Sequence, residues 1–244
     1  MSGLRTGSFE SLVAQPDTHV VVDLAPAGDA LLILFGGIAG GVSMPVFEFF
    51  RVTADVPAKR VFLRDPRRGW YQLGIPGVGD SAADIAGLLA EIIARAGTAR
   101  VVMAGASAGG FAAMQLGVLC DVDEVLAFSP QTFVDAANRR AAGDDRWPEQ
   151  ITALHAAAQQ RAFTLDLLDI LPERVGKTRH RIHVSTDEPL DLLHAHRIGH
   201  LENVEIVEHE AGGHRLVKTL RDRGLLRPML LAALGEPGTP LSPQ

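Results

Sequence analysis

Short apolar segments alternate with amphipathic ones along most of this chain. The apolar segments are rich in Val, Ile, Leu and Phe and have the length of strands: 19–24, 30–35, 60–64, 100–104, 123–128, 180–185 and 204–207. Between them, apolar side chains recur at helical spacing, most clearly in 82–97 and also in 109–120, 191–200 and 216–220. Strands that alternate with helices are joined by right-handed crossovers, so the pattern predicts an α/β fold with a mostly parallel central sheet flanked by helices.

The first two apolar segments predict a turn between them. Segments 19–24 and 30–35 are separated by Ala25-Pro26-Ala27-Gly28-Asp29, and we expect the two strands to form a hairpin. Segment 30–35 is apolar at every position, which is typical of a strand buried on both faces. It runs directly into Gly36-Gly37-Ile38-Ala39-Gly40-Gly41, a loop whose backbone can approach another group closely.

Nothing in the sequence divides the chain. It contains no internal repeat and no linker, so residues 1–244 are expected to form a single domain. Residues 131–178 contain two or three helical pieces without a clear strand, which predicts an insertion between two strands of the sheet. Only the proline-rich end, about 236–244, is expected to be disordered.

Composition excludes several classes of protein. No apolar stretch approaches the roughly 18 residues needed to span a bilayer, so no membrane span is predicted. A net charge of −6 disfavours a dedicated nucleic-acid-binding protein. Cys120 is the only cysteine, which leaves no intrachain disulfide, and residues 1–15 lack the pattern of a signal peptide. We therefore expect a cytoplasmic protein, and its oligomeric state stays open.

The main candidate for chemistry is Ser107, in Gly105-Ala106-Ser107-Ala108-Gly109. The motif lies between a predicted strand and a predicted helix, where a strained turn exposes a nucleophilic serine and requires small neighbours. The same turn directs the amide of Ala108 and the helix N-terminus toward a developing oxyanion. A phosphate-binding or merely tight glycine turn is the alternative interpretation.

A nucleophilic serine needs a histidine base and a carboxylate that orients the base. His214 follows the last predicted strand in a glycine-rich segment and is the preferred base; the alternative is an exposed loop histidine. Asp187 and Asp191 both follow the preceding strand. Asp187 is preferred because it lies at the carboxyl edge of the sheet, whereas Asp191 is also placed to cap the next helix.

An oxyanion needs a second donor besides the amide of Ala108. The amide of Gly37, or that of Ile38, comes at the end of the buried strand 30–35 and is the candidate. His196 and His200 are separated by the spacing of a helical metal site, but no acidic residue accompanies them as in H-E-x-x-H. We therefore expect no metal and no organic cofactor.

Phe35-Gly36-Gly37, the turn at Ser107, Asp187 and His214 together resemble the α/β-hydrolase superfamily in order and spacing, over roughly residues 19–233. The resemblance implies the α/β-hydrolase fold, a triad in the order Ser, Asp, His, and a cap formed by the insertion at about 131–178. It also implies an acyl pocket under that cap, for which Trp70, Tyr71 and Phe133 are candidate lining residues, although large aromatic side chains are more often packed in the core. The subgroup is similar to poorly characterised bacterial hydrolase-like proteins.

These patterns predict a serine hydrolase of esterase or thioesterase type that acts on a small-molecule acyl substrate. Ser107 attacks the acyl carbon, His214 is the base, Asp187 orients it, and the amides of Gly37 and Ala108 bind the oxyanion. The alternative is a non-hydrolytic protein of the same fold: a binding or scaffold protein, or an acyltransferase or lyase in a biosynthetic or surface-polysaccharide pathway.

Overall fold

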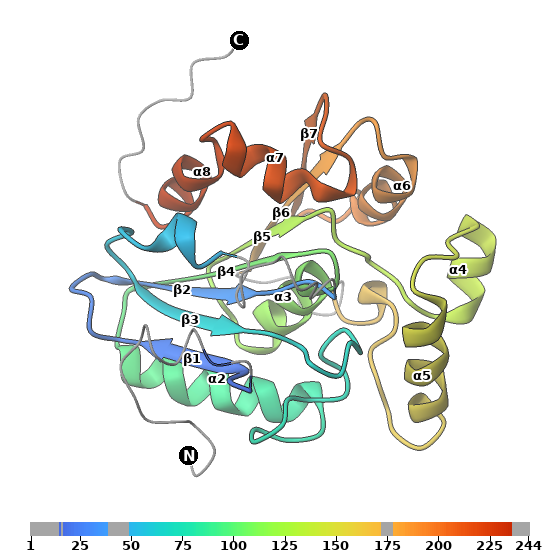
Figure 1. Ribbon diagram of the computed structural model, residues 1–244, viewed down its shortest axis with the longest axis horizontal. Helices are drawn as coiled ribbons and strands as arrows, with labels where there is room; N and C mark the ends of the chain where they lie inside the picture. Colours follow the sequence, from blue (N-terminus) through green and yellow to red (C-terminus); the bar gives the residue numbers. More distant parts are fainter. Residues whose placement is uncertain (1–14, 16, 39–48, 172–177, 236–244) are drawn as a thin grey trace.

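The computed structural model describes residues 15, 17–38, 49–171 and 178–235, and it has one seven-stranded sheet with helices on both faces (Figure 1). The strands lie in the order β1-β3-β2-β4-β5-β6-β7. All neighbouring pairs are parallel except β1 and β3, which are antiparallel. The strand bounds are β1 Val20–Asp23, β2 Ala30–Phe35, β3 Lys59–Leu63, β4 Arg100–Ala106, β5 Glu124–Phe128, β6 Arg179–Ser185 and β7 Val204–His209. The predicted α/β architecture and strand positions are confirmed.

The hairpin expected between the first two strands is wrong. β1 pairs with β3, with Val20 opposite Leu63, and β2 also pairs with β3, so that β3 lies between them. The connection 24–29 therefore crosses one strand, a distance of about 10 Å at roughly 4.8 Å per strand spacing. Turn-forming residues indicate that the chain reverses, but they do not indicate which strand fills the space beside it.

The sheet is buried on both faces, as the continuous apolar pattern of β2 predicts. Leu31, Ile33 and Phe35 belong to one apolar cluster, while Leu32 and Leu34 belong to the other. The first cluster includes α2 (Ala82–Ala96), α3 (Ala108–Leu119) and α6 (Pro189–Ile198); the second includes α7 (Leu216–Asp222) and α8 (Leu226–Ala233). Because successive side chains of a strand point to opposite faces, each cluster receives every second residue.

Helix ends follow the local sequence. The hydroxyl of Ser81 accepts a hydrogen bond from the amide of Asp84 and caps α2, which ends at Gly97 with a φ of 58°. Helix α8 and the short 3₁₀ helix η1 (Arg51–Thr53) were not predicted. None of the helices in the described part of the chain has the length and apolar content that a bilayer crossing requires.

The insertion between β5 and β6 contains α4 (Ala136–Ala142), α5 (Pro148–Ala158) and the 3₁₀ helix η2 (Leu167–Asp169). Its described residues form no strand, only an isolated bridge between Phe133 and Asp166. Both α helices lie beyond the ends toward which the arrows of β2 and β3 point (Figure 1). The end of the insertion, 172–177, the glycine-loop residues from Ala39 onward and the expected disordered tail lie outside the described residues.

Candidate active site

Ser107 occupies the strained turn that its motif predicts. β4 ends at Ala106, α3 begins at Ala108, and Ser107 between them has φ 53° and ψ −119°, a region that side-chain-bearing residues rarely adopt. Both glycines of the motif are required by close contacts. A Cβ on Gly105 would overlap the carbonyl of Gly109, and a Cβ on Gly109 would lie 2.5 Å from the carbonyl oxygen of Phe35.

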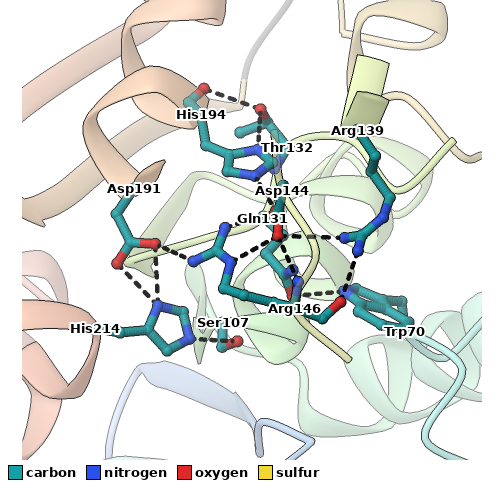
Figure 2. A network of polar contacts seen from close by, with 10 residues as sticks. All are labelled: Trp70, Ser107, Gln131, Thr132, Arg139, Asp144, Arg146, Asp191, His194 and His214. Carbon is teal, nitrogen blue, oxygen red and sulfur yellow. Dashed lines mark hydrogen bonds and ion pairs between the residues drawn. The ribbon is translucent and has the colours of Figure 1, made fainter. Parts of the chain in front are cut away.

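His214 and Asp191 continue from Ser107 in one hydrogen-bonded line (Figure 2). Nε2 of His214 lies 2.9 Å from Oγ of Ser107. Nδ1 of His214 lies 2.8 Å from Oδ2 and 3.0 Å from Oδ1 of Asp191. His214 comes from the 3₁₀ helix η4 (Gly213–Arg215) after β7, and Asp191 from the first turn of α6. Three distant segments thus meet at the carboxyl end of the sheet.

The Asp191 carboxylate is fully buried and remains ionised. Burial acts to raise its pKa, but the hydrogen bonds and charges of His214 and Arg146 outweigh burial and hold the pKa below its ordinary value. A carboxylate in this state can fix the tautomer of His214, with the proton on Nδ1 and the lone pair of Nε2 facing Ser107.

The preference for Asp187 as the partner of His214 is corrected by these contacts. Asp187 is exposed; its carboxylate accepts hydrogen bonds from the hydroxyl of Ser185 at 2.5 Å and from the amides of Gly213 at 2.9 Å and Gly212 at 3.3 Å. It therefore supports the backbone that carries His214. Asp191 is not the helix cap either, since Glu188 occupies that position and Asp191 is the third residue of the helix, in its first turn.

The expected oxyanion donors lie at the same end of the sheet. Phe35 pairs with Gly105 across β2 and β4, and the carbonyl of Gly36 lies 2.7 Å from where a Cβ on Gly109 would be. The backbone leading to Gly37 thus packs directly on the start of α3, beside Ala108. Ile38 is buried.

The candidate pocket residues are covered by protein and present no surface to a substrate. Trp70, Tyr71 and Phe133 are each at most 1% exposed. Nε1 of Trp70 donates to Oε1 of Gln131 at 3.0 Å. The hydroxyl of Tyr71 donates to the carbonyl of Gly36 at 2.9 Å, which connects Tyr71 to the expected oxyanion loop. Phe133 packs against the ring of His194, with 4.0 Å between ring centroids.

Sequence reasoning missed Arg146, whose guanidinium contacts Asp191 at 2.7 Å from within the insertion. Arg146 lies in the short polar connection between α4 and α5, which has neither an apolar periodicity nor a motif that would mark it. Among the described residues there is no group of three His, Cys, Asp or Glu side chains that could hold a metal ion. His196 pairs with Glu208 at the surface.

Comparisons with sequence-family models and with curated proteins found no match. Solved structures are similar at low identity. The esterase EaEST from Exiguobacterium antarcticum is 13% identical, with 89% of this chain and 96% of that chain covered and a TM-score of 0.58. A capsule O-acetyltransferase of Neisseria meningitidis serogroup A is 12% identical, with 84% and 88% covered and a TM-score of 0.61. A lipase-esterase related protein from Clostridium acetobutylicum is 14% identical, with 87% and 98% covered and a TM-score of 0.57. The sheet order, the helices on both faces and these similarities together identify the chain as a protein with the α/β-hydrolase fold.

Proposed function

We propose that this protein is a serine hydrolase that cleaves an ester or thioester of a small-molecule acyl substrate. The observation that carries the proposal is the continuous line from Ser107 through His214 to Asp191, in which both contacts have hydrogen-bond length. A binding protein that has lost catalysis does not need the serine and histidine within this reach. Esterases among the structures of the same fold agree with the proposal.

The proposed reaction has two steps. Oγ of Ser107 attacks the acyl carbon while Nε2 of His214 takes its proton, and the same nitrogen then protonates the leaving oxygen or sulfur. Water attacks the resulting acyl-serine after giving a proton to His214, and the breakdown of the second tetrahedral intermediate returns that proton to Ser107. Asp191 stabilises the imidazolium formed in each step.

The negative oxygen of each tetrahedral intermediate is assigned to two backbone donors: the amide of Ala108 at the start of α3, and that of Gly37 or Ile38. Removing one donor of this kind costs about 10²–10³ in kcat, so the geometry of the second donor matters for the rate. In this scheme His214 takes and returns each proton, while Asp191 and the two backbone amides stabilise the charges that form.

Covalent labelling tests the proposal. A fluorophosphonate probe should modify Ser107, identified by peptide mass spectrometry, and Ser107→Ala should abolish both labelling and esterase activity. A panel of p-nitrophenyl esters of rising chain length, run beside acyl-CoA thioesters, then defines the acyl group. Full activity in the Ser107→Ala variant, or a labelled residue other than Ser107, would refute the proposal.

Acyl transfer to an alcohol is a second candidate, favoured by the similarity to a capsule O-acetyltransferase. Both reactions share the acyl-serine and differ in whether water or a hydroxyl compound accepts the acyl group. The discriminating measurement is the ratio of acetate to acetylated acceptor formed from p-nitrophenyl acetate as a sugar acceptor is added. Hydrolysis alone at every acceptor concentration excludes the transferase.

A further inference from the structure

The second partner of the Asp191 carboxylate comes from the insertion. Nη1 of Arg146, in the segment between α4 and α5, donates to Oδ1 of Asp191 at 2.7 Å (Figure 2). The Asp191 side chain is fully buried, and the Arg146 side chain is 18% exposed. A buried carboxylate needs compensation of its charge, and Arg146 supplies a permanent positive charge whether His214 is neutral or protonated.

The guanidinium itself is held in a fixed orientation. Nε and Nη2 of Arg146 donate to the two oxygens of Asp144 at 3.0 and 2.8 Å, a fork that leaves Nη1 directed at Asp191. Nη2 of Arg139 donates to the carbonyl of Arg146 at 2.6 Å, which also fixes the backbone. The buried Asp144 carboxylate therefore determines where the positive charge lies.

His194 anchors this arrangement to the same helix that carries Asp191. Nδ1 of His194 accepts a hydrogen bond from the amide of Thr132 at 3.0 Å, so the ring proton is on Nε2, which donates to Asp144 at 3.1 Å. Burial holds the pKa of His194 below its ordinary value, which keeps the ring neutral. Asp191 and His194 are three residues apart on α6 and lie on one face of it.

We propose that Arg146 is a positioning residue of the triad, through which the insertion between β5 and β6 takes part in catalysis. It fixes the Asp191 carboxylate and, by its charge, opposes protonation of the Asp191–His214 pair. The inference rests on the proposed function and adds a residue that the fold alone does not require. Loss of Arg146 should disturb the orientation of Asp191 and let the pair hold its proton to higher pH.

Two substitutions at Arg146 separate charge from geometry. Arg146→Met removes the cation and should lower kcat on the order of tenfold to hundredfold with KM changed less than about threefold, and it should move the acid limb of the pH–rate profile up by about one pH unit. Arg146→Lys keeps the charge but cannot form the fork, so it should lower kcat while the acid limb stays within a few tenths of a unit.

Arg197→Met is the matched control. Arg197 lies on α6 and forms an ion pair with Asp166 of the insertion, with Nη1 2.7 Å from Oδ1, so its loss also removes one positive charge and one link between α6 and the insertion. Its ion pair with Asp166 and its stacking over the ring of Phe133 do not involve Ser107, His214 or Asp191. Its kcat and acid limb should match wild type.

An NMR titration of the His214 ring in wild type and Arg146→Met decides the inference without activity. An upward move of the ring's titration midpoint in Arg146→Met supports it, and an unchanged midpoint together with an unchanged pH–rate profile overturns it. Circular dichroism verifies that each variant is folded; if Arg146→Met fails to fold, a wild-type kcat in Arg146→Lys overturns the positioning role. Absence of Ser107 labelling in wild type would instead refute the proposed hydrolase, so the two failures are distinguishable.

Discussion

Asp191→Asn should inactivate the triad while leaving its shape intact. The contacts around Asp191 determine how the new amide lies. Arg146 can only donate, and it lies 2.7 Å from Oδ1, so the amide oxygen takes that position. The amide nitrogen then occupies the position of Oδ2, 2.8 Å from Nδ1 of His214.

An amide nitrogen at that position donates to Nδ1 and forces the ring proton onto Nε2. Nε2 then presents a proton, not a lone pair, to Ser107 across the 2.9 Å contact and cannot act as a base. Substitutions of this kind in Ser-His-Asp triads lower kcat about 10⁴-fold. We expect kcat/KM to fall on the order of 10³–10⁴-fold, which corresponds to about 4–5.5 kcal/mol of transition-state stabilisation.

Asp187→Asn is the matched control, because it removes the charge of the other aspartate after β6. The amide oxygen of Asn can still accept the hydrogen bond from Gly213, so kcat/KM should remain within about tenfold of wild type. The assay is the initial hydrolysis rate of p-nitrophenyl acetate, with the rate of fluorophosphonate labelling as a second readout. An equal loss in the two variants, or less than a tenfold loss in Asp191→Asn, would refute the assignment of Asp191.

The remaining predictions concern the turn, the oxyanion loop and stability in acid. Gly109→Ala should lower the free energy of unfolding by about 2–3 kcal/mol in urea titrations, because the new Cβ would lie 2.5 Å from the backbone of β2. Gly87→Ala is the control: it lies in α2 with nothing within 4 Å of the new Cβ, so the free energy of unfolding should rise by about 0.5–1 kcal/mol. Equal effects of the two substitutions would contradict the packing at the turn. Tyr71→Phe should lower kcat about tenfold and weaken the binding of a boronic acid transition-state analogue by the same factor. The Tyr71 hydroxyl holds the carbonyl of Gly36, and because the peptide is planar this also fixes the direction of the Gly37 amide. Unchanged affinity for the analogue would exclude this role. Burial, with smaller contributions from the charges of His209 and Arg181, lowers the pKa of His183 to about 3. In the unfolded chain the pKa of histidine is roughly 6.5, so the folded state favours the neutral ring. The free energy of unfolding therefore falls as the pH falls from roughly 6.5 toward 3, because the unfolded chain takes up the proton first. Unfolding titrations at pH 7.5, 6 and 5 should therefore show a steeper loss in wild type than in His183→Gln, and parallel slopes would contradict it.

Most of the secondary structure could be predicted because it depends on short-range patterns. The apolar run of β2 reads as a doubly buried strand, Ser81 and Gly97 mark the ends of α2, and the glycines around Ser107 indicate the turn between β4 and α3. Each of these signals is contained in a few consecutive residues, where sterics and hydrogen-bonding capacity are the same in any tertiary setting. The α/β class with a mostly parallel sheet followed from their order, and the resemblance to the α/β-hydrolase superfamily implied the particular fold.

The pairing of strands and the partners in the site could not be predicted in this way. Whether β1 lies beside β2 or β3 depends on which strand fills the intervening space, and whether Asp187 or Asp191 meets His214 depends on the direction in which the chain turns after β6. Asp144, Arg146 and His194 carry no motif at all, and their network exists only because the insertion packs against α6. The sequence alone thus determined the turn at Ser107 and the order of the elements, whereas the tertiary structure decided that Asp191 lies beside His214 and Arg146 beside Asp191, because long-range contacts depend on distances that no local pattern encodes.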